Sequence, residues 1–267
     1  MKNSYQNLRK ITMDNKSFDS KRIAEGYVKR PWLHEKVIEQ IKSDYHITKN
    51  FKNGLDVGCG AGLSTKGLKL ICDKVTGTDI SSEMINVCNK LYEDNLYYFY
   101  VAKAEETRIP KEKYDIITAA GVINWVDKDR FLANASQIMN SKGIMVIYDF
   151  WITDKMNEKA EYTDWYQTKY LKKFPKPPRN ENVWNQDDLT EDFLMEKQTI
   201  YEMEYGFNME DFIDFMMIQS NVNAKIESGE ISEKETKEWM QDTLQSIFQN
   251  RTRTLIFSGY SWYIRKN

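Results

Sequence analysis

Short apolar runs alternate with helix-like stretches through the first 150 residues of this 267-residue chain. The runs with the length and bulk of buried strands are residues 53–58, 74–80, 96–102, 114–120 and 143–150. Between them the sequence predicts one helix after a glycine-rich turn, one capped by Ser81 or Ser82, and one that runs from Asp127 to a stop at Gly143. Strands that alternate with helices predict an α/β fold, in which a parallel sheet binds ligands at the carboxyl ends of its strands.

The pattern changes after Trp151. Residues 151–186 are rich in Tyr and Trp, include the proline turn FPKPPRN at 174–180, and show no clear strand. This composition predicts a cap laid over the sheet. A short helix is expected from Asp187.

The C-terminal part returns to alternating strand and helix patterns. A strand is expected near residues 198–205, followed by two helices. The second of these helices opens with a capping box formed by Ser232 and Glu235. The closing stretch TRTLIFSGYSWYIR, at 252–265, has the length and alternation of a final strand, antiparallel at the end of the sheet.

The composition favours a folded protein outside the membrane. Hydrophobic residues make up 41% of the chain, which is enough for a sizeable core, and the net charge is only −2. This balance of charge argues against a nucleic-acid partner or a membrane surface. The cysteines, at positions 59, 72 and 88, form no CxxC pair and suit a reducing compartment, and no apolar run is long enough for a membrane helix. A cytoplasmic protein without a metal site is expected, and its oligomeric state is left open.

The stretch LDVGCGAGLSTKGL at 55–68 carries glycines where a predicted strand gives way to a helix. Glycines at such a turn let a ligand approach the backbone, and the helix N-terminus offers it N–H groups. The spacing is G-x-G-x-G, with Leu63 where a dinucleotide-binding turn has its third glycine. Ser64, Thr65 and Lys66 come in the wrong order for a P-loop. A tight turn without any ligand is the alternative.

Asp79 ends the second predicted strand, at the same edge of the sheet as the glycine turn. A carboxylate there can accept hydrogen bonds from both hydroxyls of a ribose, which suits NAD and other adenosine ligands equally. The alternative is a solvated carboxylate or a helix cap. The turn and the carboxylate together favour an adenosine ligand.

Five motifs occur in an order that resembles the class I S-adenosylmethionine-dependent methyltransferases, specifically the small-molecule branch (methyltransferase type 11, similar to trans-aconitate methyltransferases). They are LDVGCGAG, TGTDIS, AKAEE, YDIITAAGVINWVD and NSKGIMVIYDF. The resemblance implies a Rossmann-like three-layer sandwich with a seven-stranded, mostly parallel sheet, an antiparallel last strand and a helical cap. It also implies S-adenosylmethionine as cofactor and S-adenosylhomocysteine as product. The expected parts are an N-terminal helical segment that contributes to a lid (1–50), the cofactor-binding core (51–150), an aromatic cap (151–196), and the rest of the sheet with inserted helices (197–267).

Carried over position by position, the resemblance assigns cofactor contacts. Asp56 would lie near the methionine amino group, Asp79 would hold the ribose hydroxyls, and Ile80 would press on the adenine. The whole predicted set is Asp56, Gly58, Cys59, Gly60, Gly62, Asp79, Ile80, Ala104, Glu105 and Ala120. The chain departs from the family at Lys103, where relatives often carry an acidic residue that accepts from the adenine amino group.

The acceptor is expected to be a small molecule that offers a carboxylate or another oxygen or nitrogen nucleophile. In-line positioning would supply most of the catalysis, and a carboxylate acceptor needs no general base. Candidate catalytic residues are Trp125, His34 and Tyr27, and candidate acceptor contacts are Tyr27, Arg30, Trp32, Trp125 and Trp151. Asn124 stands where relatives frequently place a histidine, so no base is evident there. Packing or plain surface exposure is the alternative for each of these side chains.

Three other functions are alternatives. A nucleic-acid or protein methyltransferase is disfavoured by the near-neutral charge, and the loop after the fourth strand has neither an Asn/Asp-Pro-Pro-Tyr run nor a cysteine. A non-catalytic protein that binds S-adenosylmethionine and serves a partner would keep the same turn. A nicotinamide-dependent oxidoreductase is disfavoured by Leu63.

Overall fold

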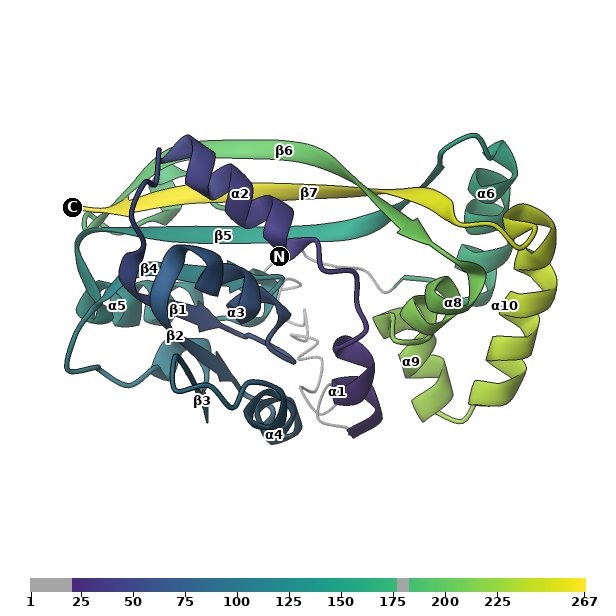
Figure 1. Cartoon of the computed structure of the whole chain (residues 1–267), viewed down its shortest axis with the longest axis horizontal. Helices are drawn as coiled ribbons and strands as arrows, with labels where there is room; N and C mark the ends of the chain where they lie inside the picture. Colours follow the sequence, from purple (N-terminus) through teal and green to yellow (C-terminus); the bar gives the residue numbers. More distant parts are fainter. Residues whose placement is uncertain (1–20, 177–182) are drawn as a thin grey trace, which may run out of the picture.

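The computed structural model describes residues 21–176 and 183–267, which form a seven-stranded sheet with helices on both faces (Figure 1). The strands are β1 (Phe51–Val57), β2 (Cys72–Asp79), β3 (Tyr97–Val101), β4 (Tyr114–Ala120), β5 (Met139–Met156), β6 (Phe193–Phe207) and β7 (Arg253–Lys266). Their order in the sheet is β3-β2-β1-β4-β5-β7-β6. Strands β1 to β5 are parallel, and β7 runs antiparallel to both β5 and β6. The predicted fold class is confirmed, including the antiparallel last strand.

The helices fall into a core group and a cap group. The core group is α1 (Lys21–Tyr27), α2 (His34–Asp44), α3 (Leu63–Leu68), α4 (Ser82–Leu91) and α5 (Lys128–Ile138). The cap group is α6 (Ala160–Asp164), a π-helical stretch (Trp165–Tyr170), α7 (Leu171–Lys173), α8 (Met209–Met217), α9 (Ser220–Glu227) and α10 (Glu233–Phe248). Ser81 is the N-cap of α4, as one of the two predicted options, and its hydroxyl accepts from the Met84 N–H at 3.2 Å. The predicted proline turn lies largely outside the described residues.

Two apolar cores sandwich the sheet, one on each face. Along β5, Val146 and Tyr148 are buried in the core shared with α2 and α3, whereas Met145 and Ile147 are buried in the core shared with α5. This alternation follows from the two-residue repeat of a strand that is covered on both faces. The three predicted layers are therefore present.

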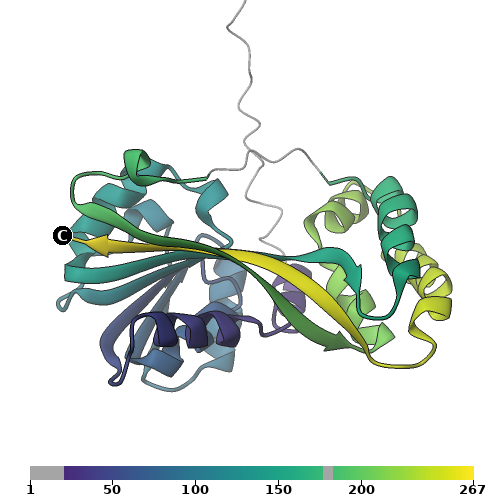
Figure 2. The same ribbon diagram turned by 90° about the horizontal axis from the view of Figure 1, so that it is seen from above.

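Three strands run without a break from the core into the cap (Figure 2). β5 stays paired with β7 from Ile144 to Met156, and β6 pairs with β7 along its whole length. The expected domain boundaries at 150 and 196 therefore fall inside strands. The aromatic side chains of the cap continue the apolar core that lies on the α2 and α3 face of the sheet. Among them, Trp165 stacks on Tyr170 with the ring centroids 5.5 Å apart.

One predicted helix extends too far. Helix α5 stops at Ile138, and Gly143, the expected helix stop, lies inside β5. The physical reason is strand pairing, because Met139 is already extended and in register with Tyr114 at the start of β4. Pairing with a central strand has overridden the helical periodicity of this stretch, so the prediction was wrong here.

The C-terminal elements agree in part with those predicted from the sequence. The capping box is confirmed at the start of α10, where Ser232 Oγ accepts from the Glu235 N–H at 3.1 Å and Glu235 Oε2 accepts from the Ser232 N–H at 3.0 Å. Three helices, α8 to α10, replace the two that were predicted. The helix expected from Asp187 is a single 3-10 turn, Gln186–Asp188.

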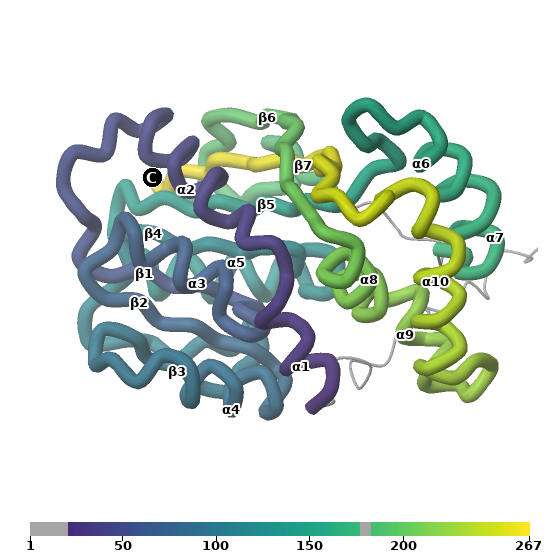
Figure 3. The backbone as a smooth tube through the Cα atoms, turned by 45° about the vertical axis from the view of Figure 1, so that its right-hand side comes forward, coloured from purple at the N-terminus to yellow at the C-terminus, as the bar shows by residue number. Residues whose placement is uncertain are grey.

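Helix α1 lies between the core and the cap (Figure 3). It packs against Ala61 of the glycine turn, Met84 of α4 and Ile218 just beyond α8. The contact with the cap is close, since a Cβ on Gly26 would lie 2.6 Å from the Ile218 side chain. Helix α1 therefore links the glycine turn to the cap.

Candidate active site

The glycine turn between β1 and α3 opens to a ligand at one of its glycines. Three glycines of the turn have positive φ angles: Gly58 (64°), Gly60 (52°) and Gly62 (88°). A Cβ on Gly58 would overlap Val122, and a Cβ on Gly62 would overlap a tyrosine ring that follows α4. Among the described residues, a Cβ on Gly60 would meet only Tyr27, at 3.6 Å. Gly60 is thus the position at which a ligand can reach the backbone.

Asp79 lies at the end of β2, beside this turn. Its Oδ2 accepts a hydrogen bond from the Gly60 N–H at 2.9 Å, and its Oδ1 accepts one from the Ser81 N–H at 2.9 Å. These bonds hold the carboxylate next to the open glycine, at the carboxyl ends of two adjacent parallel strands. The place suits a contact with ribose hydroxyls, which stays a prediction.

Asp56 is completely buried beneath the turn. Its Oδ2 accepts hydrogen bonds from the hydroxyls of Ser64 (2.6 Å) and Thr65 (2.7 Å), and its Oδ1 accepts one from Thr118 (2.8 Å). Burial raises the pKa of Asp56 to about 6, although the three hydroxyls act in the opposite direction. The carboxylate ties β1 to α3 and β4, and its predicted place near the methionine amino group stays a prediction.

Replacing Asp56 with Asn is expected to remove a pH dependence of stability. Because the pKa rises from 3.8 to about 6 on folding, the folded protein holds the extra proton between these values. Stability from this group is complete below about pH 4 and is lost as the pH rises through 6. Relative to Asp56→Asn, the free energy of unfolding of the wild type should fall by about 3 kcal/mol between about pH 4 and pH 7. Urea unfolding at both pH values measures this fall, and an unchanged difference would contradict it.

The residues predicted at the adenine lie after β2 and β3. Ile80 follows β2 directly and is 43% exposed, which is unusual for an isoleucine beside a buried sheet. Ala104 is buried and opens a 3-10 turn after β3. The Glu105 Oε1 accepts from the Asp127 N–H at 2.7 Å, so Glu105 braces the start of α5.

The end of β4 brings in a residue that the sequence analysis missed, Asp149. Ala120 closes β4, and a Cβ on the next residue, Gly121, would lie 3.2 Å from Asp149 Oδ1. The carboxylate therefore stands beside the end of β4, on the part of β5 that continues beyond it. An available signal was its place at the end of the fifth predicted strand, which repeats the place of Asp79 at the end of the second.

Tyr27 and Arg30 stand next to the open glycine. Tyr27 is the residue that Gly60 faces, and the Arg30 guanidinium lies over the Tyr27 ring with 3.9 Å from Cζ to the centroid. The Arg30 Nε is buried and has no hydrogen-bond partner among the described residues. Since a buried donor without an acceptor is costly, this nitrogen marks a place for an anionic or carbonyl oxygen of a ligand.

Two other candidates, Trp32 and His34, are held by protein contacts. The Trp32 Nε1–H donates to the Leu63 carbonyl at the start of α3, at 3.0 Å. The His34 Nδ1 lies 2.9 Å from the Tyr148 hydroxyl. Burial, helped by the charge of Arg30, lowers the pKa of His34 to about 3, so the imidazole is neutral at physiological pH. These contacts favour a packing role for both side chains.

Trp125 and Trp151 are exposed indoles beyond the end of β4, Trp125 in the loop that follows β4 and Trp151 on β5. Trp125 closes a 3-10 turn shortly after β4 and is 41% exposed, and Trp151 on β5 is 45% exposed. Apart from Trp32, the predicted acceptor contacts thus form two groups. Tyr27 and Arg30 lie by the glycine turn, and Trp125 and Trp151 lie on the β4 and β5 side.

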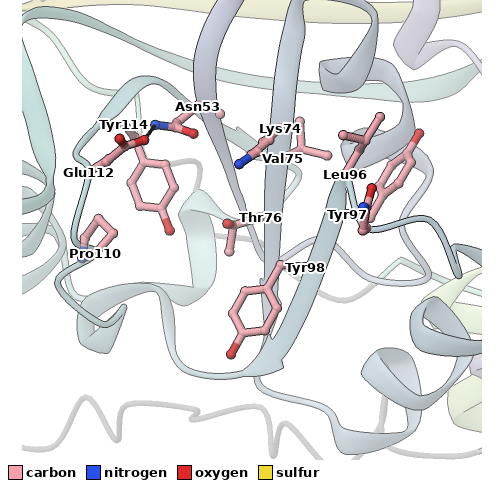
Figure 4. A pocket seen from close by; sticks show the side chains of 12 residues that line it. Asn53, Lys74, Val75, Thr76, Leu96, Tyr97, Tyr98, Pro110, Glu112 and Tyr114 are labelled. Atoms are coloured by element: carbon pink, nitrogen blue, oxygen red, sulfur yellow. Dashed lines mark hydrogen bonds between the residues drawn. The ribbon is translucent and has the colours of Figure 1, made fainter.

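A shallow pocket of about 170 Å³ lies away from this edge, near the starts of β2 and β3 (Figure 4). Lys74, Tyr98, Glu112 and Tyr114 are among its lining residues. None of the predicted site residues lines it. The candidate site is therefore at the carboxyl ends of the strands, where a parallel sheet binds its ligands.

Comparisons with known proteins bear on this geometry. A family model described as a methyltransferase domain matches residues 55–147, from β1 into β5. The ubiquinone biosynthesis O-methyltransferase of Bradyrhizobium diazoefficiens is 28% identical over 177 residues, which cover 64% of this chain and 67% of that protein. The malonyl-(acyl-carrier protein) O-methyltransferase 1 of Ilyobacter polytropus is 25% identical over 182 residues, which cover 65% of this chain and 68% of that protein.

The fold has a solved counterpart. A structure from Anaeromyxobacter dehalogenans, provisionally assigned as a type II methyltransferase, has a TM-score of 0.65 and 19% identity, and covers 86% of this chain and 94% of that one. At this identity the likeness concerns the fold alone. The domain match covers four of the five sequence motifs in full and most of the fifth. Residues 55–147 are therefore similar to a methyltransferase domain, and the described residues share their fold with that solved structure.

Proposed function

We propose that this protein transfers a methyl group from S-adenosylmethionine to an oxygen or nitrogen nucleophile of a small molecule. The observation that carries the proposal is that the open Gly60 bonds to Asp79 and faces Tyr27, over whose ring the Arg30 guanidinium lies. The cofactor has two polar regions that match this placement, namely the ribose hydroxyls and the methionine carboxylate. The residues present therefore fit the cofactor.

Each side chain has a defined task in this proposal. Asp79 accepts hydrogen bonds from the ribose hydroxyls, and the exposed Ile80 covers the adenine face. We assign Arg30 to the methionine carboxylate rather than to the acceptor. Its buried Nε has no partner among the described residues, and its guanidinium lies over Tyr27, the residue that Gly60 faces. The residues at the end of β4, Ala120 and Gly121, leave room at the reacting centre.

Catalysis is then mainly a matter of position. S-adenosylmethionine supplies an activated sulfonium methyl group. The protein has to hold the acceptor in line with that methyl and to exclude water, and positioning of this kind can contribute about 7 to 11 kcal/mol. Helix α1 and the cap, which meet across the turn, provide the cover.

Calorimetry tests the cofactor assignment directly. Titration of the protein with S-adenosylhomocysteine should give a binding isotherm, whereas titration with NADH should give none. The reverse result would favour a nicotinamide-dependent oxidoreductase. Label transfer from methyl-labelled S-adenosylmethionine to a panel of acids, phenols and amines then separates an enzyme from a non-catalytic binding protein.

Replacing Arg30 with Gln is expected to weaken binding of S-adenosylhomocysteine about 30-fold, because a charge-assisted hydrogen bond of about 2 kcal/mol is lost. The matched ligand is 5′-methylthioadenosine, which has the same nucleoside but no carboxylate. Its affinity should be the same for the wild type and for Arg30→Gln. An equal loss for both ligands would mean that Arg30 supports the fold of the site and does not bind the carboxylate.

The kind of acceptor and the location of the protein are also part of this proposal. The curated relatives are named as O-methyltransferases, which supports a small-molecule acceptor. No helix in residues 21–176 and 183–267 is long and apolar enough to cross a membrane. The small net charge of −2 supports an enzyme without a nucleic-acid partner, and the three cysteines, which form no CxxC pair, support a cytoplasmic location.

A further inference from the structure

Three side chains form a wall beside the end of β4, which we call the β5–β7 wall: Asp149 and Trp151 of β5 and Tyr260 of β7. Asp149 and Tyr260 are register partners in the antiparallel pair β5–β7, so their side chains lie on one face of the sheet. Trp151 is two residues beyond Asp149 and shares that face. The ring centroids of Trp151 and Tyr260 are 6.4 Å apart.

The wall is adjacent to the expected position of the methyl group. The Asp149 Oδ1 lies 3.2 Å from the Cβ position of Gly121, the residue that follows β4. Trp151 is 45% exposed although the next residue on the strand, Ile152, is buried. The Tyr260 ring is fixed by stacking on Trp262, at 4.8 Å between centroids. A ligand at the end of β4 therefore meets a carboxylate, an accessible indole and a fixed phenol ring.

This combination selects for positive charge. The faces of indole and phenol rings carry negative potential and attract cations, and a carboxylate adds a full negative charge. The same wall disfavours an anionic acceptor, because like charges at close range repel. We propose that the acceptor is an amine whose ammonium group binds at the β5–β7 wall. The inference rests on the proposed function and narrows its acceptor to nitrogen, whereas the curated relatives are named for transfer to oxygen.

The methyl transfer to the amine has two steps. The bound ammonium first gives one proton to water by way of Asp149, which leaves a neutral amine. The nitrogen lone pair then attacks the methyl carbon, so that a nitrogen–carbon bond forms while the carbon–sulfur bond breaks and sulfur keeps the electron pair. The positive charge moves from sulfur to nitrogen. The wall stabilises the charge that forms on nitrogen, and this interaction is stronger in the transition state than with the neutral amine.

A pair of ligands of equal shape tests the charge preference. Choline and its neutral isostere 3,3-dimethylbutan-1-ol are titrated by calorimetry into protein saturated with S-adenosylhomocysteine. Choline is expected to bind at least about 10-fold more tightly than the alcohol, as a desolvated cation–π contact and a carboxylate predict. Asp149→Asn and Trp151→Leu should each reduce this ratio several-fold. The matched control is Asp154→Asn. This carboxylate lies further along β5 and accepts a hydrogen bond from the Gln167 amide. The ratio of choline to alcohol affinity should not change in this variant.

Each outcome decides the proposal. Equal binding of the two ligands, no binding of choline, or an unchanged ratio in both wall variants would overturn the amine assignment. Circular dichroism and the affinity for S-adenosylhomocysteine show whether each variant is folded. If the wild type binds S-adenosylhomocysteine without a charge preference, and transfers label to phenols or acids rather than to alkylamines, the amine inference fails and the methyltransferase function stands. If S-adenosylhomocysteine does not bind at all, the proposed function itself fails.

Discussion

Replacing Asp79 with Ala should weaken the binding of S-adenosylhomocysteine by about three orders of magnitude, or about 4 kcal/mol. The reason is the loss of two hydrogen bonds from ribose hydroxyls to one carboxylate, each worth about 1.5 to 3 kcal/mol. The variant also loses the bonds from Asp79 to the N–H groups of Gly60 and Ser81, which hold the site in place. Calorimetry with the wild type and the variant at equal salt measures the difference.

Two controls separate binding from folding in this experiment. Asp79→Asn has nearly the same size and keeps one acceptor oxygen, so its loss should be intermediate. The ligand 5′-methylthioadenosine contains the ribose and should lose as much affinity as S-adenosylhomocysteine, which is the opposite of the expectation for Arg30→Gln. An affinity within about threefold of the wild type for Asp79→Ala would contradict the ribose contact.

Replacing Gly58 with Ala is expected to lower the free energy of unfolding by about 4 kcal/mol. Two costs combine at this position. The φ angle of +64° is unfavourable for any residue with a Cβ, and that Cβ would lie 2.1 Å from the Val122 side chain. Chemical unfolding of the wild type and the variant gives the difference directly.

Gly229 offers a matched control for the backbone cost alone. Its φ angle is +76°, and no heavy atom of the described residues lies within 4 Å of its Cβ position. Gly229→Ala should therefore cost about 1 kcal/mol, the strain without the overlap. The double variant Gly58→Ala with Val122→Ala should recover part of the loss. If Gly58→Ala and Gly229→Ala lower the free energy of unfolding equally, the Val122 side chain moves aside without cost.

The strands and the turn could be predicted because their signals are local. Buried strands covered on both faces are short apolar runs, and a glycine turn with φ angles near +60° requires glycines in the sequence itself. The antiparallel last strand could be predicted from the length of residues 252–265 and from the alternation of apolar and polar residues in this stretch. Helix α5 was predicted too long because the start of β5 is set by its pairing with Tyr114 on β4, which helical periodicity does not reveal.

The position of a candidate site residue could be predicted where the residue lies at a strand end. It could not be predicted where it depends on contacts with residues distant in the sequence. The place of Asp79 at the sheet edge could be predicted, because Asp79 is the last residue of β2. The burial of Asp56 could not, because it depends on hydroxyls supplied by α3 and β4. The alignment of Asp149 with Tyr260 needs a register between strands that are separated by more than a hundred residues. The buried Nε of Arg30 was equally hidden, since nothing in the sequence says which donors lack a partner.

The continuous strands β5, β6 and β7 limit how this enzyme can move. Domains joined by single loops close by rotating about a hinge of a few residues. Here the cap is carried by antiparallel ladders, and swinging it would break many backbone hydrogen bonds at once. We therefore expect substrates to enter and products to leave past elements that no ladder fixes. Helix α1 is one of these, since only side-chain packing holds it between the turn and the cap.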